Sequence, residues 1–177
     1  MASVRDYKSV ARAGNVVTFT QRVGSPVLVQ IAGPRPDGGD TDAQRFSTQV
    51  TINYTELLAI AQGRKLDPTA PVYSVVKHQG RNPFAEMIAI GRADNCDVTV
   101  ASGEVSKFHA YLTRDPTDPH RYVVADANSS NGTFLNDQRL PEGQAVPVNA
   151  GDKIRLGAHL VLQFFPPPDF WSELNKD

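Results

Sequence analysis

The sequence is poor in features that mark several large classes of protein. It has a single cysteine, Cys96, in 177 residues, which excludes an internal disulfide and a cysteine metal cluster and suits a reducing compartment. Its four histidines are scattered without the spacing of metal ligands, so we predict no metal and no other cofactor. Cys96 itself is expected to be a small buried hydrophobic residue beside Val98.

Long apolar runs and a strong net charge are lacking as well. No apolar stretch approaches the ~18 residues that span a bilayer, and the charged N-terminus has no hydrophobic signal-peptide core. The formal net charge is −1, so no basic field for nucleic acid or membrane surfaces extends over the whole molecule. We therefore predict a cytoplasmic protein that binds neither nucleic acid nor membrane, and whose recognition of any anion is local.

The composition is that of a globular chain, with 40% apolar and 21% charged residues. Residues 1–66 are expected to form an N-terminal α+β extension. Residues 16–20 and 27–31 are rich in β-branched residues and are separated by a Gly-Ser-Pro turn, which predicts a hairpin. Residues 33–40 contain three glycines and two prolines and are predicted to be a linker. Residues 53–63 are predicted to be one short helix, because apolar residues recur at helical spacing between a capping asparagine and a glycine.

From residue 67 onward, the pattern is one of strands and turns. Nine short apolar runs recur about every ten residues with Gly, Pro, Asn or Asp between them, which is typical of an antiparallel sandwich. The runs are residues 72–76, 86–90, 97–100, 110–112, 122–125, 133–135, 145–148, 153–156 and 160–165. Three prolines end the last run. Residues 169–177 form an aromatic tail that we expect to cover part of the core or of the extension, the alternative being an exposed anchor for a partner.

Three clusters between these runs carry hydrogen-bond donors suited to an anion. They are Gly91-Arg92, Ser106-Lys107-Phe108-His109 and Ser129-Ser130-Asn131-Gly132-Thr133. Each cluster borders a predicted strand. If the strands pair, the clusters become loops at one edge of the β-structure, where a phosphate could bind.

Five separated clusters resemble the signature of the forkhead-associated (FHA) domain in order and spacing. They are residues 90–92, 97–98, 105–110, Asp126 with 129–136, and 151–157. The resemblance covers about residues 70–165 and leaves residues 1–66 without a recognised family. It implies an all-β fold, an antiparallel sandwich of about eleven strands over residues 67–168, whose loops at one end bind phosphothreonine peptides.

The resemblance also implies which residues form the site. The phosphopeptide-binding residues would be Arg92, Ser106, Lys107, Ser130 and Asn131, supported structurally by Gly91, His109, Gly132, Thr133 and Asn136. The chemistry agrees, because phosphothreonine carries about −1.5 to −2 charges and needs a guanidinium, hydroxyl donors and fixed amides. Lys107 stands where the family often has arginine or asparagine, and it keeps the charge but loses bidentate geometry. Arg92 could instead form a surface salt bridge, and Asn131 could belong to an ordinary Asn-Gly turn.

A third alternative, beside a phosphopeptide-binding module and a phosphate-independent interaction domain, is an enzyme. Ser106, His109 and Asp126 could make a Ser/His/Asp set, but no G-x-S-x-G elbow accompanies them, and the resemblance gives His109 the role of tying the binding loops together. We therefore predict a non-enzymatic module that binds a phosphothreonine-containing partner, such as a kinase, a kinase substrate or its own regulator. A phosphate-independent interaction domain with the same fold remains the alternative.

Overall fold

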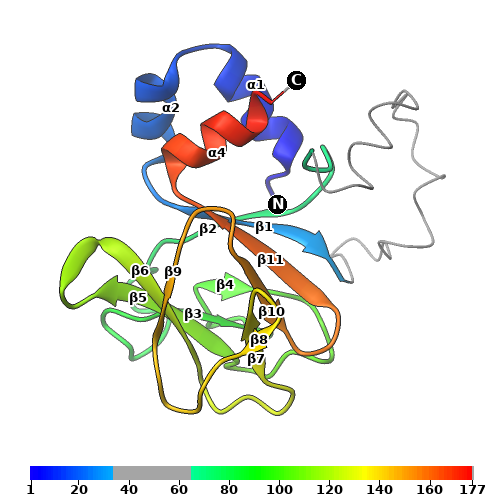
Figure 1. The fold of residues 1–177 in the computed structure, drawn as a ribbon, viewed down its shortest axis with the longest axis vertical. Helices are drawn as coiled ribbons and strands as arrows, with labels where there is room; N and C mark the ends of the chain where they lie inside the picture. The colour runs from blue at the N-terminus through cyan, green and yellow to red at the C-terminus, as the bar shows by residue number, and fades with distance from the viewer. Residues whose placement is uncertain (34–64, 177) are drawn as a thin grey trace.

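The computed structural model describes residues 1–33 and 65–176, and these residues form a two-sheet β-sandwich with a helical layer on one side (Figure 1). The strands of the described chain are β1 (Val27–Ala32), β2 (Val72–Ser74), β3 (Ile88–Gly91), β4 (Val98–Thr99), β5 (Ala110–Asp115), β6 (Asp118–Asp126), β7 (Thr133–Leu135), β8 (Gln138–Arg139), β9 (Val146–Val148), β10 (Lys153–Leu156) and β11 (Leu160–Phe165). The all-β sandwich of eleven strands is thus confirmed. The linker predicted beyond Gly33 and the helix predicted at residues 53–63 lie outside the described residues.

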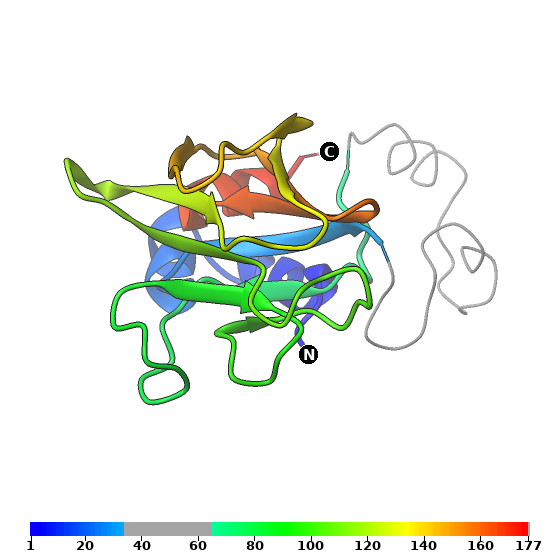
Figure 2. The same cartoon turned by 90° about the horizontal axis from the view of Figure 1, so that it is seen from below.

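The strands form two sheets, which Figure 2 shows in a second view. One has six strands in the order β2-β1-β11-β10-β7-β8, and the other has five in the order β4-β3-β5-β6-β9. All pairings are antiparallel except β3 with β4. All nine predicted runs coincide with strands, whereas the two-residue β8 was not predicted. None of the helices among the described residues has the length and apolar character needed to cross a membrane.

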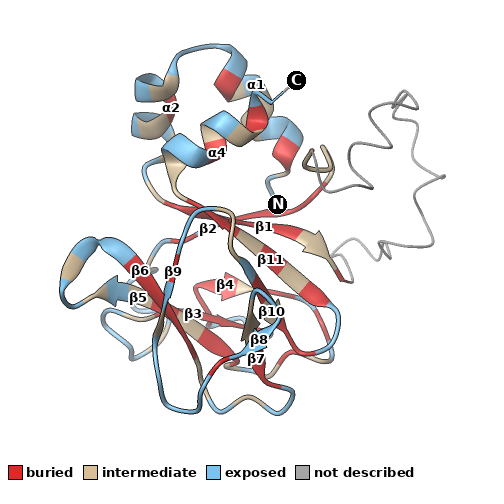
Figure 3. Cartoon of the chain, viewed as in Figure 1, coloured by how far each residue is buried: buried red, intermediate tan, exposed pale blue. Residues whose placement is uncertain are grey.

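The main core fills the space between the sheets, where Figure 3 shows the buried residues concentrated along the strands. Alternate residues of each strand point inward because successive side chains of a strand face opposite sides. Six of the large inward side chains are fully buried, and each contributes about 1.5–3 kcal/mol by leaving water: Leu28, Ile90, Leu112, Val124, Ile154 and Leu162. Cys96 and Val98 are also buried, as expected for a small hydrophobic residue at position 96.

A second apolar cluster lies under the helical layer, which consists of α1 (Val4–Arg12), α2 (Val16–Val23) and α4 (Pro167–Leu174). Phe170 of α4 is 0% exposed, and its ring packs on Tyr7, Phe19 and Phe165 at centroid distances of 5.4, 6.1 and 5.9 Å. The aromatic tail therefore covers the N-terminal helices and the outer face of the six-stranded sheet. The burial of Phe170 contradicts the alternative of an exposed anchor.

The predicted hairpin is wrong. Residues 16–20 belong to helix α2, because the Asn15 side chain accepts hydrogen bonds from the amides of Val17 and Thr18 at 3.0 and 3.1 Å. Gly24, with φ of 70°, ends the helix in the left-handed conformation. The cap at each end and the burial of the apolar face outweigh the strand preference of β-branched residues.

The second half of that predicted hairpin is a strand, but its partners are distant in sequence. β1 pairs with β11 on one side and β2 on the other, so it lies inside the six-stranded sheet. Its Gln30 is buried, and the Gln30 side-chain oxygen accepts a hydrogen bond from the Tyr73 hydroxyl at 2.9 Å. Burial raises the pKa of Tyr73 to about 12, so the hydroxyl keeps its proton. The predicted domain boundary after residue 66 stays a prediction.

Candidate functional site

Three loops at one end of the sandwich form the candidate site: residues 92–97 after β3, residues 100–109 before β5, and residues 127–132 before β7. The first two loops are joined through their backbones. The amide of Arg92 donates to the Ser106 carbonyl at 3.1 Å, and the amide of Ala93 donates to the Lys107 carbonyl at 3.2 Å. These bonds place Arg92 beside Ser106 before any ligand is present.

Gly91 permits this close approach. A Cβ built at position 91 would lie 2.2 Å from the carbonyl oxygen of Lys107 and 3.0 Å from the Cys96 sulfur. Atoms do not approach that closely, so any side chain would force the two loops apart. The glycine is required by the contact between backbones, since its own φ is not in the left-handed region.

His109 joins the second loop to the third. Its ring is fully buried; Nδ1 accepts a hydrogen bond from the Ser106 amide at 3.0 Å, and Nε2 lies 3.2 Å from the Gly132 carbonyl oxygen. Because Nδ1 accepts, the neutral ring carries its proton on Nε2 and donates it to Gly132. Burial lowers the pKa of His109, although the bond to Gly132 favours the protonated ring. Both ring nitrogens are thus bonded to backbone groups, and the geometry is not that of a Ser/His/Asp triad.

The third loop is held by Asp126. Its carboxylate accepts hydrogen bonds from the Ser129 amide at 2.9 Å, the Ser129 hydroxyl at 2.7 Å and the Thr133 hydroxyl at 2.5 Å. Burial opposes ionisation of Asp126, but the bonds from Thr133 and Ser129 outweigh it and lower its pKa. Ser129 then accepts from the Gly132 amide at 3.0 Å, and Gly132 adopts a φ of +80°. These hydrogen bonds fix the turn that carries Ser130 and Asn131.

The outward side of these loops carries the side chains predicted to bind a ligand. Ser106 is half-buried, whereas Arg92, Lys107, Ser130 and Asn131 are exposed. The Ser106 hydroxyl oxygen accepts from the Ser130 amide at 3.1 Å, so its own proton is available to a ligand. Neither Arg92 nor Lys107 has a side-chain hydrogen bond or ion pair with any residue in the described ranges. The site therefore presents two cations and a hydroxyl donor side by side.

Asn131 and Asn136 have different surroundings. The Asn131 side-chain amide donates to the Glu104 carbonyl at 2.7 Å, which links the second and third loops and leaves its oxygen facing outward without a partner among the described residues. Asn136, at the far end of β7, donates to Asp152 at 2.8 Å and accepts from the Lys153 amide at 2.9 Å. Asn136 thus fixes another turn and does not contact the other nine predicted residues.

Glu104 is a supporting residue that the sequence analysis did not identify. Its carboxylate accepts from the amides of Ala158, His159 and Leu160 at 2.9, 3.1 and 3.0 Å. The second loop is thereby attached to the turn between β10 and β11. The His159 ring nitrogen Nδ1 also lies 3.3 Å from this carboxylate. No local sequence signal indicates these contacts, because the partners are more than fifty residues apart and most are backbone amides.

Comparison with known proteins agrees with this geometry. The family model of the FHA domain matches residues 88–157, which span all three loops. This part of the chain is an FHA domain. The FHA match begins at β3 and ends after β10, so it includes the Arg92, Ser106 and Asn131 positions.

Several relatives are known. The serine/threonine-protein kinase cds1 of Schizosaccharomyces pombe is 30% identical over 121 residues, which cover 65% of this chain and 25% of the kinase. The solved FHA domain of an Arabidopsis thaliana hypothetical protein is 22% identical, with a TM-score of 0.49, over 80% of this chain and 84% of that one. The N-terminal FHA domain of S. cerevisiae Rad53p, solved with a phosphothreonine peptide, is 20% identical, with a TM-score of 0.46, over 58% of this chain and 89% of that one. The chain spans about a quarter or less of the length of the first curated relatives it matches.

Gly91→Ala is predicted to destabilise the FHA domain by about 1–3 kcal/mol, because the new methyl group overlaps the Lys107 carbonyl and the loops must separate. Gly103→Ala is the matched control, since a Cβ at Gly103, in the same loop region, meets nothing within 4 Å. Urea unfolding followed by circular dichroism measures both variants. Equal stability of the two would show that the loops accommodate the methyl group at no cost.

Lowering the pH is predicted to decrease the free energy of unfolding of the FHA domain through His109. Its folded-state pKa is lowered, so the native state prefers the neutral ring. The stability that depends on this neutral ring is fully present above the unfolded value of about 6.5 and is lost as the pH falls below it. The free energy of unfolding, measured from pH 7.5 to pH 5, should therefore decrease more steeply for the wild type than for His109→Gln, which cannot titrate. Parallel curves for the two proteins would contradict this assignment, since the other three histidines are exposed and are present in both.

Proposed function

We propose that this FHA domain is a phosphothreonine-peptide-binding module that mediates phosphorylation-dependent protein interaction in signalling. The observation that carries the proposal is that two exposed cations without a side-chain partner among the described residues, Arg92 and Lys107, lie on the adjoining loops that carry the Ser106 hydroxyl. A phosphate dianion needs a guanidinium, a point charge and hydroxyl or amide donors fixed in advance. The three loops carry groups of each of these kinds on backbones that are hydrogen-bonded to one another.

Each proposed binding residue has a distinct role. The Arg92 guanidinium and the Lys107 ammonium would neutralise the phosphate, while the Ser106 hydroxyl and Ser130 would donate to it or contact the phosphothreonine. Asn131 would use its free side-chain oxygen to accept a main-chain amide of the peptide. Gly91, His109, Gly132 and Thr133 would hold the loops and make no ligand contact. The proposed partner is a phosphothreonine-containing kinase, kinase substrate or regulator, and the proposed location is the cytoplasm.

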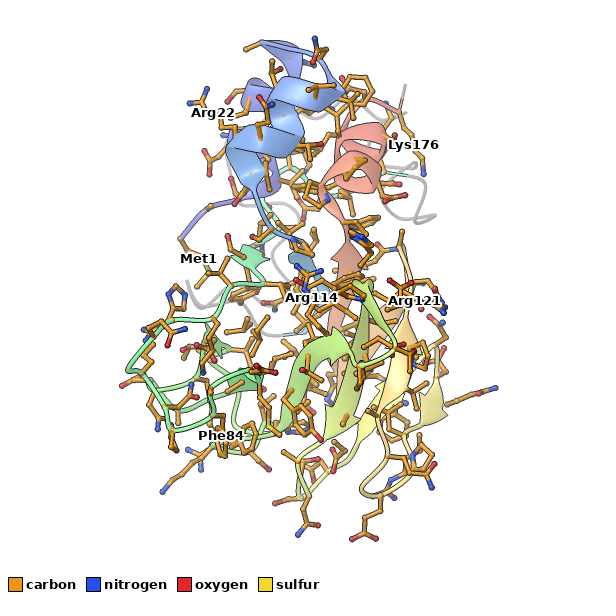
Figure 4. The ribbon with its side chains drawn as sticks, turned by 90° about the vertical axis from the view of Figure 1, so that its left-hand side faces the viewer. Met1, Arg22, Phe84, Arg114, Arg121 and Lys176 are labelled. Atoms are coloured by element: carbon orange, nitrogen blue, oxygen red, sulfur yellow. The ribbon has the colours of Figure 1, made fainter. Side chains whose placement is uncertain are left out.

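One observation favours a second candidate, a phosphate-independent interaction domain with the same fold. Phe84 is 36% exposed and its ring stacks on Phe108 at a centroid distance of 5.0 Å, while Phe108 lies 6.2 Å from Tyr111. Figure 4 shows Phe84 on the outer surface of the molecule. Exposed aromatic clusters of this kind can serve as protein contacts. Phosphate dependence separates the two candidates.

Arg92→Ala is predicted to reduce the affinity for a phosphothreonine peptide by about 2–4 kcal/mol without unfolding the domain, since it removes one partner of a charge-assisted contact. Arg121→Ala is the control, because Arg121 is also exposed but lies on the β5–β6 hairpin, at the opposite end of β6 from Asp126 (Figure 4). Isothermal titration calorimetry gives the affinities. Equal affinities of folded Arg92→Ala and wild type would eliminate Arg92 as the phosphate ligand.

The proposed site is also predicted to prefer phosphothreonine to phosphoserine. FHA resemblance implies a small pocket for the threonine γ-methyl group, and filling such a pocket is worth roughly 1–3 kcal/mol. A matched trio of peptides carrying phosphothreonine, phosphoserine or threonine should bind in that order in fluorescence polarisation, the last without detectable binding. Equal binding of the two phosphopeptides would contradict the proposed pocket for the methyl group. Equal binding of all three peptides would favour the phosphate-independent candidate.

A further inference from the structure

Arg139, on β8, lies against the loop that carries Asn131. A Cβ built at Gly132 would lie 3.0 Å from Nε, 3.2 Å from Nη2 and 3.3 Å from Cζ of Arg139. The guanidinium therefore occupies the space over the Gly132 backbone that a side chain would otherwise take. Pairing of Phe134 with Arg139 in the β7–β8 ladder holds the Arg139 backbone beside this loop.

The charge of Arg139 is not neutralised by any residue that the structure describes. The residue is exposed, and its guanidinium makes no hydrogen bond or ion pair with any residue of the described chain. Two acidic residues in this region are engaged by hydrogen bonds, Glu104 by the amides of residues 158–160 and Asp126 by Ser129 and Thr133. Asp137 is 90% exposed and forms an ion pair with Arg155 at 3.7 Å. Arg139 is thus a third unpaired cation at the loop end that also carries Arg92 and Lys107.

The position of Arg139 limits which part of a bound peptide its side chain can contact. Gly132 directly follows Asn131, the residue proposed to hold the peptide main chain. Consecutive residues of an extended peptide are about 3.3 Å apart, so a residue one or two positions from the clamped one passes within reach of a long arginine side chain. A guanidinium with a free edge matches a carboxylate in a planar, two-point contact.

We propose that Arg139 determines sequence specificity by binding an aspartate or glutamate side chain of the phosphopeptide close to the phosphothreonine. The proposal rests on the proposed phosphothreonine function and adds to it a preference for an acidic neighbouring residue. The contact of the guanidinium with Gly132 restricts the arginine before binding, which lowers the entropy lost when the carboxylate is bound.

The test uses a phosphothreonine peptide with alanine at the three positions on either side, and variants in which aspartate replaces one alanine at a time. Fluorescence polarisation gives the affinity of each peptide for wild type, Arg139→Gln and Arg121→Gln. Aspartate at one or two adjacent positions should strengthen binding to wild type about two- to five-fold, the range of an exposed ion pair. Arg121→Gln should show the same gain, and raising the salt concentration should reduce it.

The ratio of the affinities for the acidic and the neutral peptide is the deciding quantity. It should fall to about one in Arg139→Gln. A ratio of one at every position in wild type, or a gain that persists in Arg139→Gln, would overturn the role of Arg139 and leave the phosphothreonine function intact. Failure of every phosphothreonine peptide to bind wild type would instead overturn the proposed function, and this inference with it.

Discussion

A buried, neutral histidine is the constraint on which the three loops of the candidate site depend. His109 has one acceptor and one donor nitrogen, and it uses them on the Ser106 amide and the Gly132 carbonyl. The same carbonyl accepts the amide of Gly157, so this one peptide group joins the loops to the turn after β10. A charged imidazole has no acceptor for the Ser106 amide, and an apolar residue would leave both backbone groups unsatisfied. The neutral tautomer is therefore a condition for the shape of the site.

Charged side chains beneath the loops are satisfied by hydrogen bonds, whereas the cations on the loop surfaces have no partner among the described residues. Asp97, whose side chain is fully buried, accepts hydrogen bonds from Lys77, Asn82 and the amides of His78 and Ala89. Burial opposes its ionisation, but these donors outweigh the burial and lower its pKa. The buried carboxylates thus accept hydrogen bonds from fixed donors, while the cations that face solvent keep their own N–H donors free. This separation of buried carboxylates from exposed cations is how a chain with a net charge of −1 can present a cationic site.

The sequence predicted those parts of the molecule that depend on local patterns. Strands of the sandwich alternate inward and outward residues, and the site loops lie at recognisable clusters between them. Residues 16–20 were wrongly predicted as a strand because their β-branched composition is typical of one, whereas the deciding contacts are the cap at Asn15 and the burial of Phe19. The sequence alone did not single out Glu104 or Arg139, because the residues that each lies against are brought near only by the folded sheets. Charge and spacing alone do not distinguish them from solvated surface residues.

The N-terminal segment supports the loops of the candidate site through the six-stranded sheet. In β1, Leu28 faces the core between the sheets while Val27 and Val29 face the helical layer, so the strand is buried on both sides. β1 pairs with β11, β11 with β10 and β10 with β7, and β7 begins at Thr133, the residue that hydrogen-bonds Asp126 beneath the third loop. Removal of β1 would expose the backbone of β11 and two apolar faces at once. Since each strand of this series holds the next, the position of the Asn131 turn depends on a strand that lies more than fifty residues before the match to the family begins.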